Sequence, residues 1–573
     1  MRVADYLAKY LYLQGVTHVF ELVGGMITVL LDTMYQEGNI KIISMHHEQG
    51  AGFAAEGWAR IKGIPGVALA TSGPGATNLL TAIGSCYFDS VPTVFITGQV
   101  NRSEQKGDRA IRQLGFQETD IVSMAKPITK AAFQVSNAQD FPSLLHEAFT
   151  LALSGRPGPV LIDIPMDVQR IDIGMPNIPV AVRQTKPSSS SRDRLEYLKR
   201  LGMALQTSQR PLILAGGGIR SGLAVNCFRN FVKELGIPVV HSLMGIDILP
   251  YADPNRVGML GSYGNRWVNL AVGESDLLVV LGSRLDVRQT GAMTKAFKEG
   301  RQIFHVDIEA AEMNNRVIEC FTHVDDLEEF LSFAIANQKS WHSNVTRSDW
   351  FENINQLHSK YPDTEEIDAG VGINPNVFMH RLCQYTKEVG AFVADVGQHQ
   401  MWAAQSLELT KDQRWLTSGG MGAMGFGLPA AIGAAFALEG KPIVLIAGDG
   451  GIQCNIQELQ TVVRNKLPIK IIIVNNKTHG MVRQFQDSYF DKRYQSTLWG
   501  YDAPNFGDIA HAYKISQATQ NDLAIMFQSE MINNPFLLDL NVETMLNVYP
   551  KIAFGQPISG MEPEFRPLEM EGT

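Results

Sequence analysis

Short apolar runs alternate with amphipathic stretches through most of this 573-residue chain. The runs at 442–447 and 469–474 are short and rich in Ile and Val. Such runs are typical of strands that are buried on both faces of a parallel sheet. Between them, apolar residues recur at helical spacing from Ile456 to Val463. The pattern predicts a unit of strand, turn, helix and strand.

The start of that helix has its own signal. Asn455 and Glu458 stand three residues apart, as in a capping box, just ahead of the apolar positions. We therefore expect the helix to begin after Asn455. The two turns of the unit lie at the carboxyl ends of neighbouring strands, where open α/β sheets bind ligands.

The same alternation occurs in three blocks that polar stretches separate. The segment KPSSSSRDR, 186–194, is Ser-rich and lacks apolar periodicity, and a second polar stretch covers about 336–368. Alternating strand and helix patterns indicate α/β architecture. The chain is thus predicted to form three doubly wound α/β domains, at 1–182, 190–345 and 365–573.

Composition narrows the class of protein. With 45% hydrophobic and 19% charged residues, the chain has the composition of a soluble globular protein, and its net charge of −9 argues against a nucleic-acid-binding surface. No apolar run is long enough to span a bilayer, and the chain shows no signal segment. The five cysteines lack CxxC spacing, which favours a reducing compartment without disulfides. We expect a cytoplasmic protein.

The turn GDGG at 448–451 and the pair NN at 475–476 carry specific chemistry. Asp449 offers a carboxylate, and Asn476 follows 476 − 449 = 27 residues later with an amide oxygen. Mg²⁺ prefers such oxygen ligands and commonly shares them with phosphate oxygens. Glycines let the backbone approach a diphosphate at a helix N-terminus. The alternative is an ordinary crossover in which Asp449 and Asn476 merely cap turns.

Two further segments carry weaker signals. Glu48 opens a helix rich in Ala and Gly, and the turn TSGPGATN at 71–78 follows a strand. By itself Glu48 could simply cap its helix. The segment AGGGIRSG at 215–222 is a weak dinucleotide fingerprint, which a plain tight turn would also produce.

Together the motifs identify a family. HEQGAGFAAEGWAR, TSGPGATN, GFQETDIV, RPGPVLIDIP, DVGQHQMWAAQ, GGMGAMGFGLPAAIGAA and GDGGIQCNIQEL…NN occur in this order. They closely resemble the catalytic subunit of acetolactate (acetohydroxyacid) synthases, which depend on thiamine diphosphate. The resemblance runs from about residue 3 to residue 547. The family fold has a pyrimidine-binding, a FAD-binding-like and a diphosphate-binding domain, in that order.

The resemblance assigns roles around thiamine diphosphate. Glu48 matches the glutamate that hydrogen-bonds N1′ of the cofactor's pyrimidine, and Met424 matches the residue that bends the cofactor. Mg²⁺ is assigned to Asp449, Asn476 and the main-chain oxygen of Thr478. Other cofactor-binding positions are Val396, Gly397, Gln398, His399, Gly422, Gly448, Gly450, Gly451, Gly480 and Met481.

The resemblance also implies FAD, without a net redox role, in the central domain. The matching positions are Gly217, Gly218, Leu243, Met244, Arg284, Asp286, Arg288, Asp307 and Ile308. Family members form homodimers in which Glu48 and the Asp449 edge belong to different subunits. Association into a tetramer and binding of a regulatory subunit are left open.

The family reaction joins pyruvate to a second 2-ketoacid and yields 2-acetolactate for branched-chain amino acid biosynthesis. Phe116 and Gln117 match residues at the mouth of the cofactor pocket. Phe485 stands where the family carries a tryptophan that helps to recognise the acceptor, which removes an indole N–H donor. The alternatives are a carboligase for a nucleotide-linked keto-sugar, a pyruvate oxidase-like enzyme, and a non-catalytic scaffold.

Overall fold

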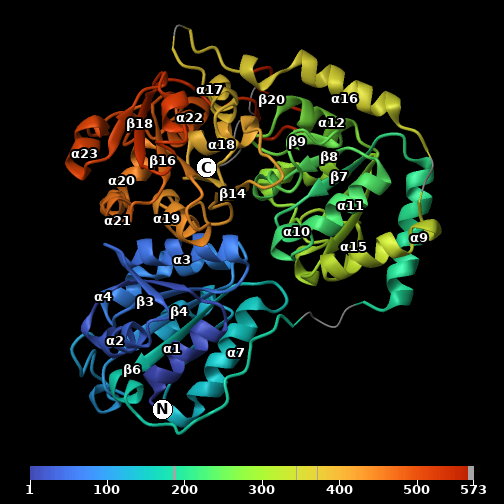
Figure 1. Cartoon of the computed structure of the whole chain (residues 1–573). Helices are drawn as coiled ribbons and strands as arrows, with labels where there is room; N and C mark the ends of the chain where they lie inside the picture. Colours follow the sequence, from blue (N-terminus) through green and yellow to red (C-terminus); the bar gives the residue numbers. More distant parts are fainter. Residues whose placement is uncertain (185–188, 343–344, 371, 566–573) are drawn as a thin grey trace.

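A computed structural model describes residues 1–184, 189–342, 345–370 and 372–565. It contains three six-stranded sheets whose strands pair in parallel, each covered by helices (Figure 1). This confirms the predicted α/β fold class. Over the described residues, no helix has both the length and the apolar character needed to cross a membrane.

The N-terminal sheet has the strand order β2-β1-β3-β4-β6-β5. Its strands are β1 His18–Leu22, β2 Lys41–Ser44, β3 Gly66–Ala70, β4 Thr93–Gln99, β5 Ala131–Gln134 and β6 Pro159–Pro165. The helices around it are α1 Val3–Leu13, α2 Thr28–Glu37, α3 Glu48–Lys62, α4 Pro74–Asn78, α5 Leu80–Phe88, α6 Ile121–Ala125, α7 Phe141–Leu153 and α8 Met166–Gln169.

The C-terminal sheet repeats that topology, with the order β14-β13-β15-β16-β18-β17. Its strands are β13 Ala391–Ala394, β14 Arg414–Thr417, β15 Ile443–Gly448, β16 Ile469–Asn475, β17 Ser516–Ala518 and β18 Phe536–Asn541. Its helices are α17 Pro375–Cys383, α18 Gln398–Ser406, α19 Gly427–Ala437, α20 Asp449–Gln453, α21 Leu459–Arg464, α22 Gly480–Tyr489, α23 Phe506–Tyr513 and α24 Leu523–Met526. The direction of winding reverses between β13 and β15, which is where sheets of this kind bind ligands.

The central sheet has a different order, β12-β11-β10-β7-β8-β9. This is the 3-2-1-4-5-6 arrangement of dinucleotide-binding domains, with its switch point between β7 and β10. The strands are β7 Pro211–Ala215, β8 Val239–His241, β9 Arg256–Met259, β10 Leu277–Leu281, β11 Gln302–Asp307 and β12 Phe321–Val324. The helices are α9 Ser191–Thr207, α10 Gly218–Ser221, α11 Val225–Leu235, α12 Arg266–Glu274, α13 Val287–Thr290, α14 Thr294–Lys298, α15 Leu327–Ala336 and α16 Ser348–Lys360.

The predicted strands at 442–447 and 469–474 are confirmed as β15 and β16, but the capping box is wrong. An additional helix, α20, begins directly at Asp449. The helix expected after Asn455 is present, as a 3-10 turn at Ile456–Glu458 that continues into α21, but the Asn455 side chain does not cap it. Its Nδ2 instead donates to Gln49 Oε1 at 3.1 Å and to Gly425 O at 2.8 Å. The oxygen that would cap the helix, Asn455 Oδ1, accepts from Gln457 Nε2 at 3.2 Å instead of from a backbone N–H.

The polar stretches are more structured than the sequence predicts. Residues 185–188 of the first stretch lie outside the described residues, but α9 begins at Ser191, so the last part of that stretch is helical. Arg194 is buried there and pairs with Asp325 at 2.6 Å and Glu329 at 2.6 Å. The second stretch contains α16, whose Trp350 and Ile354 are buried.

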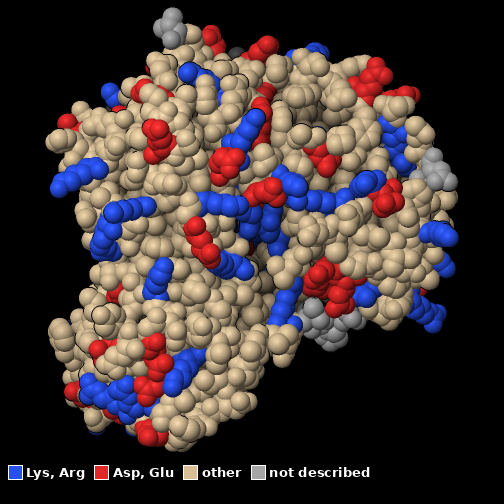
Figure 2. All heavy atoms as spheres, viewed as in Figure 1, with Lys and Arg blue, Asp and Glu red and all other residues tan. Residues whose placement is uncertain are grey.

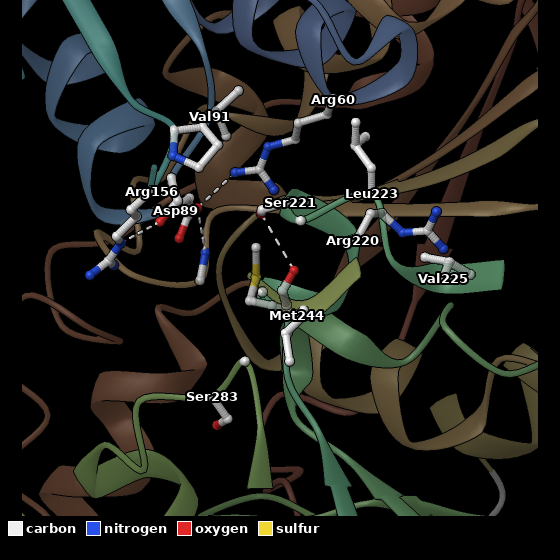
Figure 3. A pocket seen from close by; sticks show the side chains of 18 of the residues that line it. Arg60, Asp89, Val91, Arg156, Arg220, Ser221, Leu223, Val225, Met244 and Ser283 are labelled. Atoms are coloured by element: carbon white, nitrogen blue, oxygen red, sulfur yellow. Dashed lines mark hydrogen bonds and ion pairs between the residues drawn. The ribbon is translucent and has the colours of Figure 1, made fainter. Parts of the chain in front are cut away.

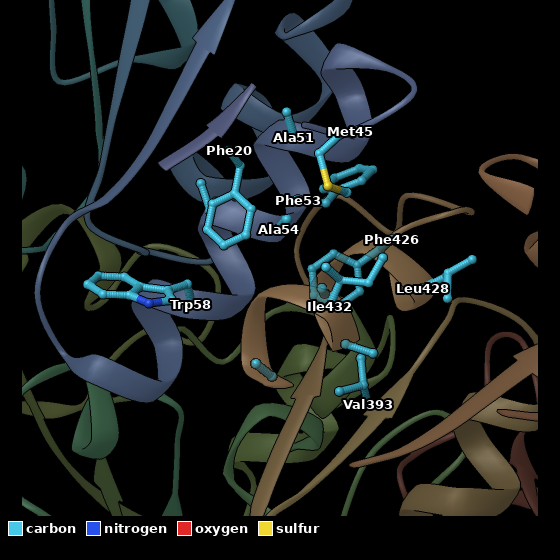
Figure 4. Packing of buried hydrophobic residues seen from close by; sticks show 14 of the residues in the cluster. Phe20, Met45, Ala51, Phe53, Ala54, Trp58, Val393, Phe426, Leu428 and Ile432 are labelled. Carbon is cyan, nitrogen blue, oxygen red and sulfur yellow. The ribbon is translucent and has the colours of Figure 1, made fainter. Parts of the chain in front are cut away.

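Helices α3 and α19 hold the N-terminal and C-terminal domains together (Figure 4). A methyl group at Gly57 would lie 2.2 Å from Ala430 O, and one at Gly433 would lie 1.8 Å from Ala54 O. The two backbones can therefore approach this closely only because both positions are glycine. Phe53 packs edge-on against Phe426 beside this contact, at 5.5 Å between ring centroids. The Ala- and Gly-rich sequences of both helices reflect this packing.

The end of the chain returns to the central domain. Strands β19 Lys551–Ile552 and β20 Met561–Glu562 form a two-stranded antiparallel sheet. The backbone of Ile552 donates to Ser262 O at 2.9 Å, and Met561 is fully buried in the central domain's core. This segment therefore joins the second and third domains.

Candidate functional site

Three oxygen atoms converge where β15 and β16 end. Asn476 Oδ1 lies 2.8 Å from the main-chain oxygen of Thr478 and 3.3 Å from Asp449 Oδ1. Oxygen atoms this close repel one another unless a cation lies between them. Magnesium binds oxygen at about 2.1 Å in an octahedron, which places adjacent ligands about 3.0 Å apart. The three predicted metal ligands therefore fit Mg²⁺.

A chain of hydrogen bonds fixes the orientation of the Asn476 amide. Asn476 Nδ2 donates to Gln398 Oε1 at 2.9 Å, and Gln398 Nε2 donates to Leu546 O at 3.0 Å. Because a main-chain oxygen can only accept, Gln398 must present its oxygen to Asn476. The amide nitrogen of Asn476 is thereby engaged, and its oxygen is left facing Thr478 and Asp449.

Gly480 is required next to this chain of hydrogen bonds. A Cβ at this position would lie 1.9 Å from Gln398 Oε1 and 2.6 Å from Asn476 Nδ2. Met481 follows it and is partly buried against the core of the C-terminal domain. Gly480 therefore lies directly against the two amides that orient the oxygen cluster.

The carboxylate of Asp449 is mostly buried, and its other oxygen has a partner. Burial raises the pKa of Asp449 to about 6, while a hydrogen bond from Tyr501 acts in the opposite direction. The Tyr501 hydroxyl lies 2.8 Å from Asp449 Oδ2. Tyr501 was not predicted from the sequence, where it stands 52 residues beyond Asp449.

The segment from Val396 to His399 forms the turn into α18, beside Gly448. The His399 ring is buried, and burial lowers its pKa to about 4. Its Nε2 is buried and has no hydrogen-bond partner among the described residues. An added Cβ at Gly448 would lie 2.9 Å from the ring. Only glycine therefore lets the end of β15 lie this close to the imidazole. A buried nitrogen without a partner is uncommon in a folded protein, which marks this edge as a candidate ligand contact.

Asp395, the first residue of the DVGQHQMWAAQ motif, organises the neighbouring loop. Its carboxylate accepts hydrogen bonds from Val396 N at 2.6 Å and from Gly425 N at 3.0 and 3.1 Å. Gly425 adopts a φ of +85° just after Met424, whose side chain is 39% exposed. Gly422 also has a positive φ of +68°. The buried Asp395 thus holds the backbone on which Met424 projects.

Glu48 and Gln117 both lie on the N-terminal domain. Glu48 is 7% exposed, and its Oε2 accepts a hydrogen bond from Asn78 Nδ2 at 2.9 Å. Gln117 has a strained φ of +66°, and its main-chain oxygen accepts from Ser72 Oγ at 2.6 Å. Phe116 is 80% exposed. The TSGPGATN turn supplies both Ser72 and Asn78, so it supports both predicted residues.

The predicted acceptor residue Phe485 lies on α22 among other aromatic rings. Its ring centroid is 4.6 Å from that of Tyr489 and 5.7 Å from that of Phe490. Phe485 is 41% exposed, so the ring offers an apolar face without a hydrogen-bond donor.

A cavity of about 790 Å³ lies between the three domains. This volume is in the range of small-molecule and cofactor sites. Its walls include Arg60 and Asp89 of the first domain and Arg220 and Met244 of the central domain (Figure 3). The third domain contributes residues from Lys411 to Gly419. All positions predicted for FAD line the cavity: Gly217, Gly218, Leu243, Met244, Arg284, Asp286, Arg288, Asp307 and Ile308.

The cavity is positively charged overall. Ten Lys and Arg residues and five Asp residues line it, and Figure 2 shows basic side chains along the hollow between the domains. Some are already paired, such as Arg60 with Asp89 at 2.7 Å and Arg156 with Glu312 at 2.8 Å. Burial raises the pKa of Asp307, at the end of β11, to about 6. The glycine turn after β7 and the excess of cations suit a diphosphate-containing ligand.

Comparison with known proteins matches all three domains. Residues 1–124 match the thiamine pyrophosphate enzyme N-terminal TPP binding domain, 198–333 the central domain, and 395–539 the C-terminal TPP binding domain. The acetolactate synthase large subunit of Lactococcus lactis is 37% identical, over 94% of this chain and 92% of its own length. That of Pyropia yezoensis is 38% identical, over 95% and 92%, and the isozyme 2 large subunit of Escherichia coli is 35% identical, over 98% and 99%. The chain therefore belongs to the acetolactate synthase large-subunit family of thiamine pyrophosphate enzymes.

Proposed function

We propose that this protein decarboxylates pyruvate with thiamine diphosphate and Mg²⁺ and transfers the two-carbon unit to a second 2-ketoacid, giving 2-acetolactate. The observation that carries the proposal is the oxygen cluster of Asp449, Asn476 and Thr478. It provides the ligands that a magnesium diphosphate complex requires, at the sheet edge where the family places the cofactor.

When bound, thiamine diphosphate supplies the electron sink for the departure of CO₂. Glu48 is proposed to hydrogen-bond N1′ of the pyrimidine and to act as its proton partner. Since Asn78 occupies Oε2, Glu48 keeps Oε1 for that contact. Met424 is proposed to press the cofactor into its bent shape from the loop that Asp395 supports. His399 is uncharged at neutral pH, because burial lowers its pKa, and is proposed to pack against the diphosphate without supplying charge.

FAD is proposed as a structural ligand of the central cavity. Two features support it: the dinucleotide-type strand order, and the position of all nine predicted residues on the cavity wall. Arg284 and Arg288 would contact the anionic part of the molecule. We further propose that the three domains span 1–182, 190–345 and 365–573 and that the FAD cavity lies between them.

A homodimer with shared active sites is also proposed. Glu48 and Gln117 bond only within the first domain among the described residues, and Asp449 bonds within the third. The loop before Gln117 exposes Ile111, Leu114 and Phe116, which a second subunit would cover. The relatives are named large subunits, which supports a separate regulatory subunit for this chain. Association of dimers into a tetramer is also proposed. The protein is proposed to be located in the cytoplasm.

The partly exposed apolar ring of Phe485 favours a second class of acceptor. This ring, which packs at a tilt against Tyr489, gives the acceptor side an apolar surface in place of an indole donor. A nucleotide-linked keto-sugar is a larger acceptor that this arrangement would admit.

Product analysis separates these acceptors. The protein is incubated with Mg²⁺, thiamine diphosphate and ¹³C-pyruvate, alone, with 2-ketobutyrate, or with a nucleotide-linked 4-keto-sugar. Acetolactate from pyruvate alone supports the main proposal. A product that forms only with the keto-sugar would replace it with the second.

A further inference from the structure

The segment between Tyr494 and Tyr501 folds back over the loop that carries the metal ligands. The main-chain oxygen of Thr497 accepts from His479 N at 3.1 Å and from Thr478 Oγ1 at 2.7 Å. Both donors are adjacent to the oxygen atom of Thr478 that faces Asn476. The segment therefore fixes the loop after β16.

The same segment also reaches the loop after β15, through Tyr501. The Tyr501 hydroxyl donates to Asp449 Oδ2 at 2.8 Å, and its ring packs on His479 at 4.3 Å between centroids. A carboxylate can rotate and can bind a metal through one or both oxygens. With Oδ2 held by Tyr501, Oδ1 remains directed at Asn476 Oδ1, 3.3 Å away.

We propose that Tyr501 is a positioning residue for magnesium: its hydroxyl fixes Asp449 as a one-oxygen ligand through Oδ1. This inference rests on the proposed function, because it takes the oxygen cluster to be the Mg²⁺ site. Tyr501 acts on Asp449 as Gln398 acts on Asn476, since each occupies the atom that the metal does not use. Loss of such an outer hydrogen bond commonly weakens metal binding 10- to 100-fold.

The test is Tyr501→Phe, which keeps the ring that packs on His479 and removes only the hydroxyl. The matched control is Tyr494→Phe, which removes a hydroxyl bonded to Asp487 at 2.5 Å in the same segment but away from the metal ligands. Binding of Mg²⁺ is measured by equilibrium dialysis of the whole protein with saturating thiamine diphosphate and no substrate. We expect Tyr501→Phe to bind Mg²⁺ about 10- to 100-fold more weakly, and Tyr494→Phe to bind like the parent.

Turnover at different Mg²⁺ concentrations gives a second measurement. A positioning role predicts that Tyr501→Phe needs more Mg²⁺ for half-maximal rate and recovers the parent kcat when the metal saturates. Unchanged Mg²⁺ binding in Tyr501→Phe, or an equal loss in both variants, would overturn the inference while leaving the proposed function intact. A parent protein that binds neither Mg²⁺ nor thiamine diphosphate would instead overturn the proposed function.

Discussion

Replacing Gly480 with alanine should disrupt the metal site through a single methyl group. That methyl carbon would lie 1.9 Å from Gln398 Oε1, whereas carbon atoms normally pack at about 3.5–4.0 Å from their neighbours. Gln398 and Asn476 must therefore separate, and their 2.9 Å hydrogen bond must break. Leaving a buried amide without its partner costs about 1–3 kcal/mol. If the cost falls on the metal-binding state, Mg²⁺ affinity drops roughly 5- to 150-fold.

The assay is Mg²⁺ binding with saturating thiamine diphosphate, together with thermal unfolding of the metal-free protein. Helix propensity acts only weakly in the opposite direction, because Gly480 is the first residue of α22 and the preference of about 1 kcal/mol for alanine over glycine applies to a helix interior. Gly25→Ala is the control, because no heavy atom lies within 4 Å of its added Cβ. A Gly480→Ala protein that melts higher than the parent and binds Mg²⁺ equally well would refute the reasoning.

Three further predictions follow from other parts of the molecule. Glu48→Gln should keep the fold and bind thiamine diphosphate but slow exchange of its C2 proton, which NMR in D₂O measures; unchanged exchange would remove Glu48 from the mechanism. Gly217→Val should abolish flavin absorbance of the purified protein while leaving Mg²⁺ binding intact, because even a Cβ there would lie 3.0 Å from Met244 Cβ. Burial opposes the charge of His380, but Asp363 at 2.9 Å and Glu408 at 2.7 Å raise its pKa to about 9. The resulting stabilisation, at most about 3 kcal/mol, is complete below pH 6.5 and is lost as the pH rises through 9. The Tm deficit of His380→Gln should therefore shrink between pH 6 and pH 10, and a constant deficit would contradict the pairing.

Strands and turns that depend on residues close together in the sequence could be predicted from it. β15 is an apolar run and β16 is interrupted within its Ile and Val residues only by Lys470, and burial on both faces makes such runs recognisable. The glycine turn after β15 and the position of Asn476 followed from the same local unit. The lining of the central cavity was also predicted, although only through the family resemblance.

Contacts between distant segments could not be predicted in this way. Asn455 was expected to cap a helix, but its amide bonds to Gln49 and Gly425 because the folded domains bring those acceptors close. Tyr501 reaches Asp449 only after the chain has passed through β16 and α22. The strand order of the central sheet is another example, since apolar runs define strands but not their neighbours.

The most direct test of the account is the reaction of the purified protein with pyruvate as the sole ketone. With Mg²⁺ and thiamine diphosphate, release of CO₂ and formation of 2-acetolactate should occur in a ratio of one to one. Both should stop when the metal is removed by chelation and return when Mg²⁺ is restored. CO₂ release and acetolactate formation that persist without metal would contradict the assigned role of Asp449 and Asn476. Absence of both products in the complete mixture would contradict the proposed reaction.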